Sequence, residues 1–163
     1  MRKYIGAVSS ALMGILTFVF LSLNQMVTKL SAGDYSSEGS SSNAWDIIKT
    51  EPVIEQDGYT LYKVFTIIAI VLACLLIISA VVMILRNLKV LKFKFSMNLI
   101  NNILLILFLV CAIVAFVGLV QMCGSAGAFG VEVSTTPAVG AYLLLGFAVV
   151  LTLVSLLFSK KAK

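Results

Sequence analysis

Four long runs of apolar residues, separated by shorter polar stretches, dominate the pattern of the chain. They cover about residues 5–27, 64–85, 99–122 and 138–158, and none contains Asp, Glu, Lys, Arg or His. A helix needs about 20 mostly apolar residues to cross the hydrocarbon core of a bilayer. Because lipid tolerates no unpaired backbone polar groups, such a run spans a membrane as an α-helix. The pattern predicts an all-α membrane protein in which residues 1–163 form one domain, a bundle of four transmembrane helices.

The connections between the runs carry weaker signals. Residues 31–43 are rich in Ser and Gly and predict a flexible segment. Residues 52–56 and 59–62, joined by Asp57-Gly58, have the pattern of a β-hairpin with an Asp-Gly turn. Residues 131–134 alternate in the same way and could add a strand to a small extracellular sheet. The alternative for Tyr59 and Tyr62 is that they anchor the second span at the membrane interface.

Composition and charge support a membrane protein and give it an orientation. The chain is 61% hydrophobic and only 12% charged, whereas soluble domains are about 25% charged. Nine of its twelve basic residues lie at the two termini and in the connection 86–98, where there is no acid. All seven acids lie in the connections 28–63 and 123–137. Since positive charge is retained in the cytoplasm, we expect both termini and residues 86–98 inside, and the other two connections outside.

These charges also indicate the surroundings of the protein. The basic inner side suits the anionic headgroups of lipids, so the net charge of +5 does not indicate a nucleic-acid partner. The first run is longer than a signal-peptide core of 7–15 residues, and we expect it to be retained. The outer connections contain no Asn-x-Ser/Thr sequon, which favours the plasma membrane of a prokaryote. The alternative is the endoplasmic reticulum, because Lys160-Lys161-Ala162-Lys163 is similar to a dilysine retrieval signal.

The sequence offers little material for catalysis. It has no His, which is the commonest general base and metal ligand. Its three cysteines are far apart and form no Cys-x-x-Cys motif. The spans also lack the ionisable residues that mark pumps, proton-coupled transporters and voltage sensors. We therefore expect no enzyme, no cofactor and no catalytic or metal-binding residue.

Packing surfaces are better marked than chemistry. Gly6, Ser10 and Gly14 recur every four residues in the first run, and such a stripe of small residues lets another helix approach closely. That helix could belong to the same chain or to a partner protein, and we take the stripe as a candidate partner face. In the first outer connection, Trp45, Tyr59 and Tyr62 are the candidate recognition residues.

Polar amides near the ends of the spans form a second group of candidates. They are Asn24, Gln25 and Gln121 on the outer side, and Asn98 and Asn102 on the inner side, with Asn101 beside them. Residues four apart share one helical face, so Asn98 and Asn102 are expected to lie together. We favour interhelical hydrogen bonds for these amides, at about 1 kcal/mol each. The alternative is that Asn24, Gln25 and Gln121 line a passive pore built from several copies.

The layout of four spans, inner termini, a longer first outer loop with Trp45 and a shorter second one resembles that of the claudins and peripheral myelin proteins. The Gly-Leu-Trp motif and the paired cysteines of that family are absent, so the resemblance covers topology alone. The sequence favours a non-enzymatic accessory, assembly or scaffold subunit that packs against other membrane proteins or copies of itself. A subunit of an oligomeric passive channel or transporter is the alternative.

Overall fold

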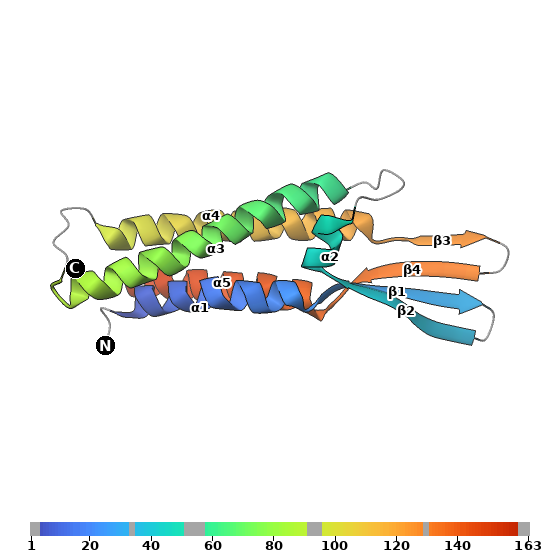
Figure 1. Cartoon of the computed structure of the whole chain (residues 1–163), viewed down its shortest axis with the longest axis horizontal. Helices are drawn as coiled ribbons and strands as arrows, with labels where there is room; N and C mark the ends of the chain where they lie inside the picture. The colour runs from blue at the N-terminus through green and yellow to red at the C-terminus, as the bar shows by residue number, and fades with distance from the viewer. Residues whose placement is uncertain (1–3, 33–34, 51–57, 91–95, 129–130, 160–163) are drawn as a thin grey trace.

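Four long helices form the body of the protein. The computed structural model describes residues 4–32, 35–50, 58–90, 96–128 and 131–159. The helices are α1 (Ile5–Ser22), α3 (Tyr59–Asn87), α4 (Met97–Met122) and α5 (Val139–Ser159), and each is long and apolar enough to cross a membrane. The predicted four-helix bundle is confirmed as an architecture (Figure 1).

Each helix packs against two neighbours, so the four form a closed bundle. α1 and α4 lie at opposite corners, and both contact α3 and α5. The centre is filled by large side chains that are fully buried, among them Met13, Leu21, Leu76, Leu105, Phe108 and Leu119. The outward faces also consist of Val, Leu and Ile side chains, such as Val8, Ile78, Val110 and Leu153. A helix that is apolar on every side suits a bundle surrounded by lipid.

A four-stranded antiparallel sheet extends beyond one end of the bundle (Figure 1). Its strands are β1 (Asn24–Ala32), β2 (Tyr35–Asn43), β3 (Ser125–Ala128) and β4 (Val131–Pro137), in the order β2-β1-β4-β3. β1 follows α1 and β4 precedes α5, so the packing of α1 on α5 places the two central strands side by side. The sheet is therefore held directly by the bundle.

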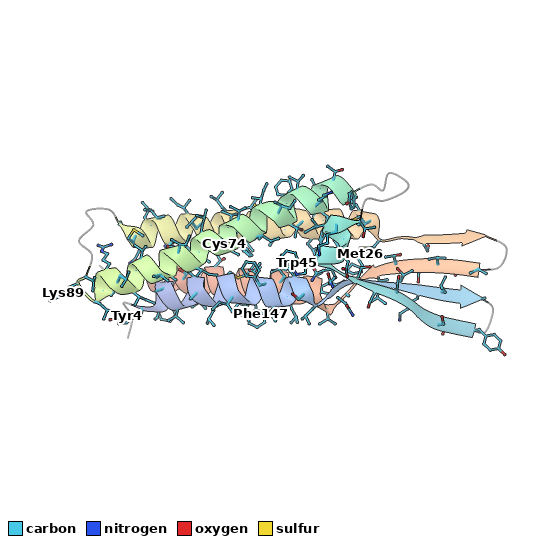
Figure 2. All side chains as sticks on the ribbon, viewed as in Figure 1. Tyr4, Met26, Trp45, Cys74, Lys89 and Phe147 are labelled. Atoms are coloured by element: carbon cyan, nitrogen blue, oxygen red, sulfur yellow. The ribbon has the colours of Figure 1, made fainter. Side chains whose placement is uncertain are left out.

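A short helix, α2 (Ala44–Lys49), lies where the sheet meets the bundle. The Asn43 side chain caps it by accepting a hydrogen bond from the Asp46 main-chain N–H at 3.0 Å. Ala44 and Ile47 are buried in the core of the bundle, and the Trp45 indole N–H donates to the Ser22 hydroxyl at 3.2 Å. Figure 2 shows Trp45 close to Met26 at this junction, whereas Tyr4 and Lys89 lie at the opposite end of the bundle.

Two predictions about the connections are wrong. The first helix ends at Ser22 and not near residue 27, because Asn24 and the residues after it pair with β2 and β4. Residues 35–43 form a strand with two irregularities in its pairing, not a flexible segment, since pairing with β1 supplies the order that a Ser-rich sequence lacks by itself.

The predicted hairpin around Asp57-Gly58 is also wrong in its second half. Residues 59–62 form the first turn of α3, and Gly58 precedes them as the N-cap with a φ of +86°. Residues 52–57 lie outside the described residues. The strand predicted at residues 131–134 is confirmed and forms part of β4.

Candidate interaction site

The stripe of small residues on α1 faces the interior of the bundle. Ser10 is fully buried, and a Cβ added at Gly14 would overlap the Ile77 side chain and lie 2.9 Å from the main-chain oxygen of Ala73 in α3. Gly6 is near α4, where the Asn101 amide donates to its carbonyl at 3.4 Å. The structure thus places the stripe in helix packing within the chain, and a partner would have to displace α3 to reach it.

Asn101 is the most buried of the three inner amides named from the sequence, although only Asn98 and Asn102 were expected to share a helical face. It is only 1% exposed, and its Oδ1 accepts hydrogen bonds from the Ser10 hydroxyl at 2.6 Å and the Ser79 hydroxyl at 3.1 Å. One amide therefore joins α1, α3 and α4. The available signal was its position one turn before buried Leu105, since the two residues share a face of α4.

The two inner amides that were singled out do not lie in one environment. Asn102 accepts a hydrogen bond from the Ser155 hydroxyl of α5 at 2.9 Å, whereas Asn98 is exposed. Close by, the Thr152 hydroxyl of α5 donates to the Leu105 carbonyl at 3.5 Å. Together with the Asn101 bonds, these contacts connect all four helices at the end of the bundle away from the sheet. Interhelical hydrogen bonding describes Asn102 but not Asn98.

The outer amides lie in two different places: Asn24 and Gln25 are near α1 and α5, and Gln121 is on α4 near the start of α3. Gln25 is buried, donates to the Phe20 carbonyl at 2.6 Å, and accepts a main-chain bond from Ala138 at 2.7 Å. Its neighbour Asn24 is exposed. Gln121 is exposed at the other side of the bundle, beside Gly58 at the start of α3. The structure does not bring these three side chains together.

The aromatic recognition candidates differ in how much surface they present. Trp45 is half-buried at the junction, and the Tyr59 hydroxyl donates to the Thr50 carbonyl at 2.7 Å. The Lys63 ammonium lies 5.5 Å from the centre of the Tyr59 ring. Tyr62 is buried in the core, and its hydroxyl has no hydrogen-bond partner among the described residues. Tyr62 is therefore unavailable to a partner, because α3 begins earlier than expected and turns it inward.

The sheet has one apolar and one polar face, which the sequence did not reveal. Directly paired residues in an antiparallel sheet project from the same side. Their register gives an apolar sheet face and a polar sheet face. The apolar sheet face carries Leu30, Ala32, Tyr35, Val131 and Val133, together with Ser37 opposite Leu30 and the Thr28–Thr135 pair nearer the bundle. The polar sheet face comprises Lys29, Ser31, Ser36, Glu132 and Ser134.

The apolar sheet face is open to the surroundings. Leu30 is 41% exposed, Val131 40% and Tyr35 85%. The same side of β1 begins at Met26, which packs on the core of the bundle, and the Thr28–Thr135 pair separates Met26 from Leu30. Exposed apolar residues gathered on one surface are typical of an interaction site. The sheet, with α2 at its base, is the candidate interaction site.

Groups that could bind a metal ion or react as thiols were also located in the structure. Within the described residues, no group of three or more His, Cys, Asp or Glu is placed to hold a metal ion. The cysteines Cys74, Cys111 and Cys123 are free, and burial raises the pKa of the Cys123 thiol, which lies just after α4.

No family model, curated protein or solved structure matches the chain.

Proposed function

We propose that this protein is a non-enzymatic multi-pass membrane protein that acts by binding other membrane proteins or copies of itself. The observation that carries the proposal is the apolar sheet face, which lies beyond one end of the bundle and has Leu30, Tyr35 and Val131 exposed. A large apolar surface exposed to water is costly, and a partner that covers it removes this cost.

The proposed orientation places the sheet outside the cell. Both termini and the turn near Lys89 are inside, where their basic residues contact anionic lipid headgroups. This proposal is supported by the placement of the sheet and of the Arg86–Lys89 region at opposite ends of the bundle. The membrane is the plasma membrane, and the lack of sequons in the outer connections favours that of a prokaryote.

The interior of the bundle supports a structural role for the helices. Asn101 and Asn102 of α4 bond to serine hydroxyls of the other three helices. Such bonds fix the helices relative to each other and so hold the sheet in one position. The proposed partner surface is accordingly the sheet and not the stripe of Gly6, Ser10 and Gly14.

Purification from the native membrane in a mild detergent tests the proposal. We expect the wild-type protein to elute as a stoichiometric complex that Leu30→Ser disrupts, because the substitution removes the central side chain of the apolar sheet face. Lys29→Ser is the matched control, since Lys29 is the neighbour on the polar sheet face. A protein that stays monomeric in the native membrane, or a complex that Leu30→Ser and Lys29→Ser weaken equally, would contradict the proposal.

A further inference from the structure

The two outermost strands of the sheet each have one unpaired edge within the part of the chain that the structure describes. β2 pairs only with β1, and β3 pairs only with β4. Neither strand contains Lys or Pro, although Glu38 in β2, the irregular pairing of β2 with β1 and the four-residue length of β3 limit the stretch that can pair to the outer half of the sheet. Exposed main-chain N–H and C=O groups along an unprotected edge are a template for another strand.

The directions of the strands determine which edges can meet in one membrane. β1 and β3 run away from the bundle, and β2 and β4 run back toward it. All copies in a membrane share one orientation, so β3 of one copy and β2 of the next are antiparallel. Two β2 edges, or two β3 edges, would instead be parallel, which is the slightly weaker pairing and interrupts the alternation.

The widths of the sheet and the bundle are also matched. Strands are spaced by about 4.8 Å, so a sheet that adds four strands per copy repeats every ~19 Å. Two packed helices side by side are separated by 8–10 Å, so a bundle two helices wide occupies about 16–20 Å. Bundles that touch in the membrane therefore bring neighbouring sheet edges to the spacing of paired strands.

The outer half of the sheet contains complete rows of four residues, which place the two edges at the same height. One row on the polar sheet face runs Ser36, Ser31, Glu132 and Gly127. The next row toward the bundle runs Glu38, Lys29, Ser134 and Ser125. In a neighbouring copy at equal depth in the membrane, Ser36 therefore lies level with Gly127, and Glu38 with Ser125.

From these relations we propose that the partner of the sheet is a second copy of this chain, whose β2 edge pairs with the β3 edge of the first copy. The inference rests on the proposed membrane function and adds a partner for the sheet edges, while the apolar sheet face stays open to the partner proposed above. The interface is head to tail, so repeated pairing gives a closed ring or an open row of copies. Each step extends one continuous antiparallel sheet with all apolar faces on the same side.

Disulfide cross-linking in native membranes tests this pairing. Two differently tagged copies, both lacking the three natural cysteines, are expressed together, one with Ser36→Cys and the other with Gly127→Cys. We expect an interchain disulfide between the two tags after mild oxidation. The matched control replaces Gly127→Cys by Ser31→Cys, which is in the same row but three strand spacings from the neighbouring Ser36, and should give several-fold less product.

Two additional double-cysteine combinations check that the sheet is formed and repeat the cross-linking test at a second row. Ser31→Cys with Ser36→Cys in one chain gives an intrachain disulfide if the sheet is formed, because these residues are directly paired. Glu38→Cys with Ser125→Cys on separate chains repeats the test one row nearer the bundle, in case a side chain at Gly127 disturbs β3.

The possible failures separate this inference from the proposed function. Predominant Ser36–Ser36 disulfides, or no interchain product from either row while the intrachain disulfide forms, would overturn the edge pairing. If the protein still elutes as a stoichiometric complex with a different protein, the proposed function stands and only the identity of the partner is wrong. If the intrachain disulfide does not form, the sheet itself is absent and the inference fails with it.

Discussion

Gly14 sets how closely α1 and α3 approach, and adding one methyl group there tests the packing of the bundle. A Cβ at this position would overlap Ile77 and stand 2.9 Å from the Ala73 carbonyl oxygen. A backbone oxygen cannot move unless α3 moves, so Gly14→Ala forces the two helices apart. Gly146 in α5 offers a matched control, because a Cβ there would have no heavy atom within 4 Å.

The expected size of the effect follows from two opposing contributions. Extra volume in a packed interior costs about 1–3 kcal/mol. Replacing Gly by Ala inside a helix gains up to about 1 kcal/mol of helix propensity. The gain is common to both variants and cancels in the comparison. We therefore expect the free energy of unfolding of Gly14→Ala to lie about 1–3 kcal/mol below that of Gly146→Ala, which should itself be as stable as the wild type or slightly more so.

Unfolding in mixed micelles with increasing SDS provides the assay. Helicity measured by circular dichroism follows the bundle, and the fluorescence of Trp45, the only tryptophan, follows its junction with the sheet. Equal stability of Gly14→Ala and Gly146→Ala, or a more stable Gly14→Ala, would show that α1 and α3 are not in close contact and would return the stripe to the candidate partner surfaces.

Three further predictions concern single side chains. Asn101→Leu should lower the free energy of unfolding by about 1–2 kcal/mol in the same assay. The substitution removes the hydrogen bonds from Ser10 and Ser79, and interhelical bonds in membranes contribute about 0.6 kcal/mol each on average and up to about 1.7. Asn98→Leu, at an exposed position, should have little effect. Gln25→Ala should cost about 0.5–1.5 kcal/mol because the Phe20 carbonyl loses its side-chain donor and keeps only the Leu23 main-chain N–H. Exposed Asn24→Ala should be nearly neutral, and equal effects would contradict the burial of Gln25. Burial raises the pKa of Cys123, so its thiolate fraction at neutral pH is below that of an ordinary thiol. The rate at which maleimide labels Cys123 should therefore keep rising with pH in the range where the labelling rate of glutathione no longer increases.

The helices were predictable because uncharged apolar runs of about 20 residues favour the α-helix, whose main-chain groups all bond within the segment. The ends were less predictable, since local pattern does not determine where a helix gives way to a strand. Asn24 and Gln25 lie within the predicted first span, yet Asn24 pairs with Asn43 of β2 and the Gln25 carbonyl accepts from the Ala138 N–H, so both lie outside α1. Likewise, β2 owes its order to β1, a contact that its own Ser-rich sequence does not encode.

Only one strand of the candidate site was predictable from the sequence. The alternation of residues 131–134 predicted part of β4. The faces of the sheet depend on the register between β1 and β4, which are separated by about a hundred residues, so no local pattern contains them. Asn101 and Asn102 are adjacent in sequence, but only the packing of α4 decides that one joins three helices and the other bonds Ser155.

The orientation of the chain across the membrane is the claim on which the proposed function depends most directly. It is tested by labelling intact cells with a membrane-impermeant maleimide, using single cysteines at Ser36 in β2 and at exposed Val90 after α3. We expect Ser36→Cys to react in intact cells and Val90→Cys to react only after the membrane is permeabilised. Reaction of both positions in intact cells, or of Val90→Cys alone, would contradict a sheet on the outer side and basic ends on the inner side.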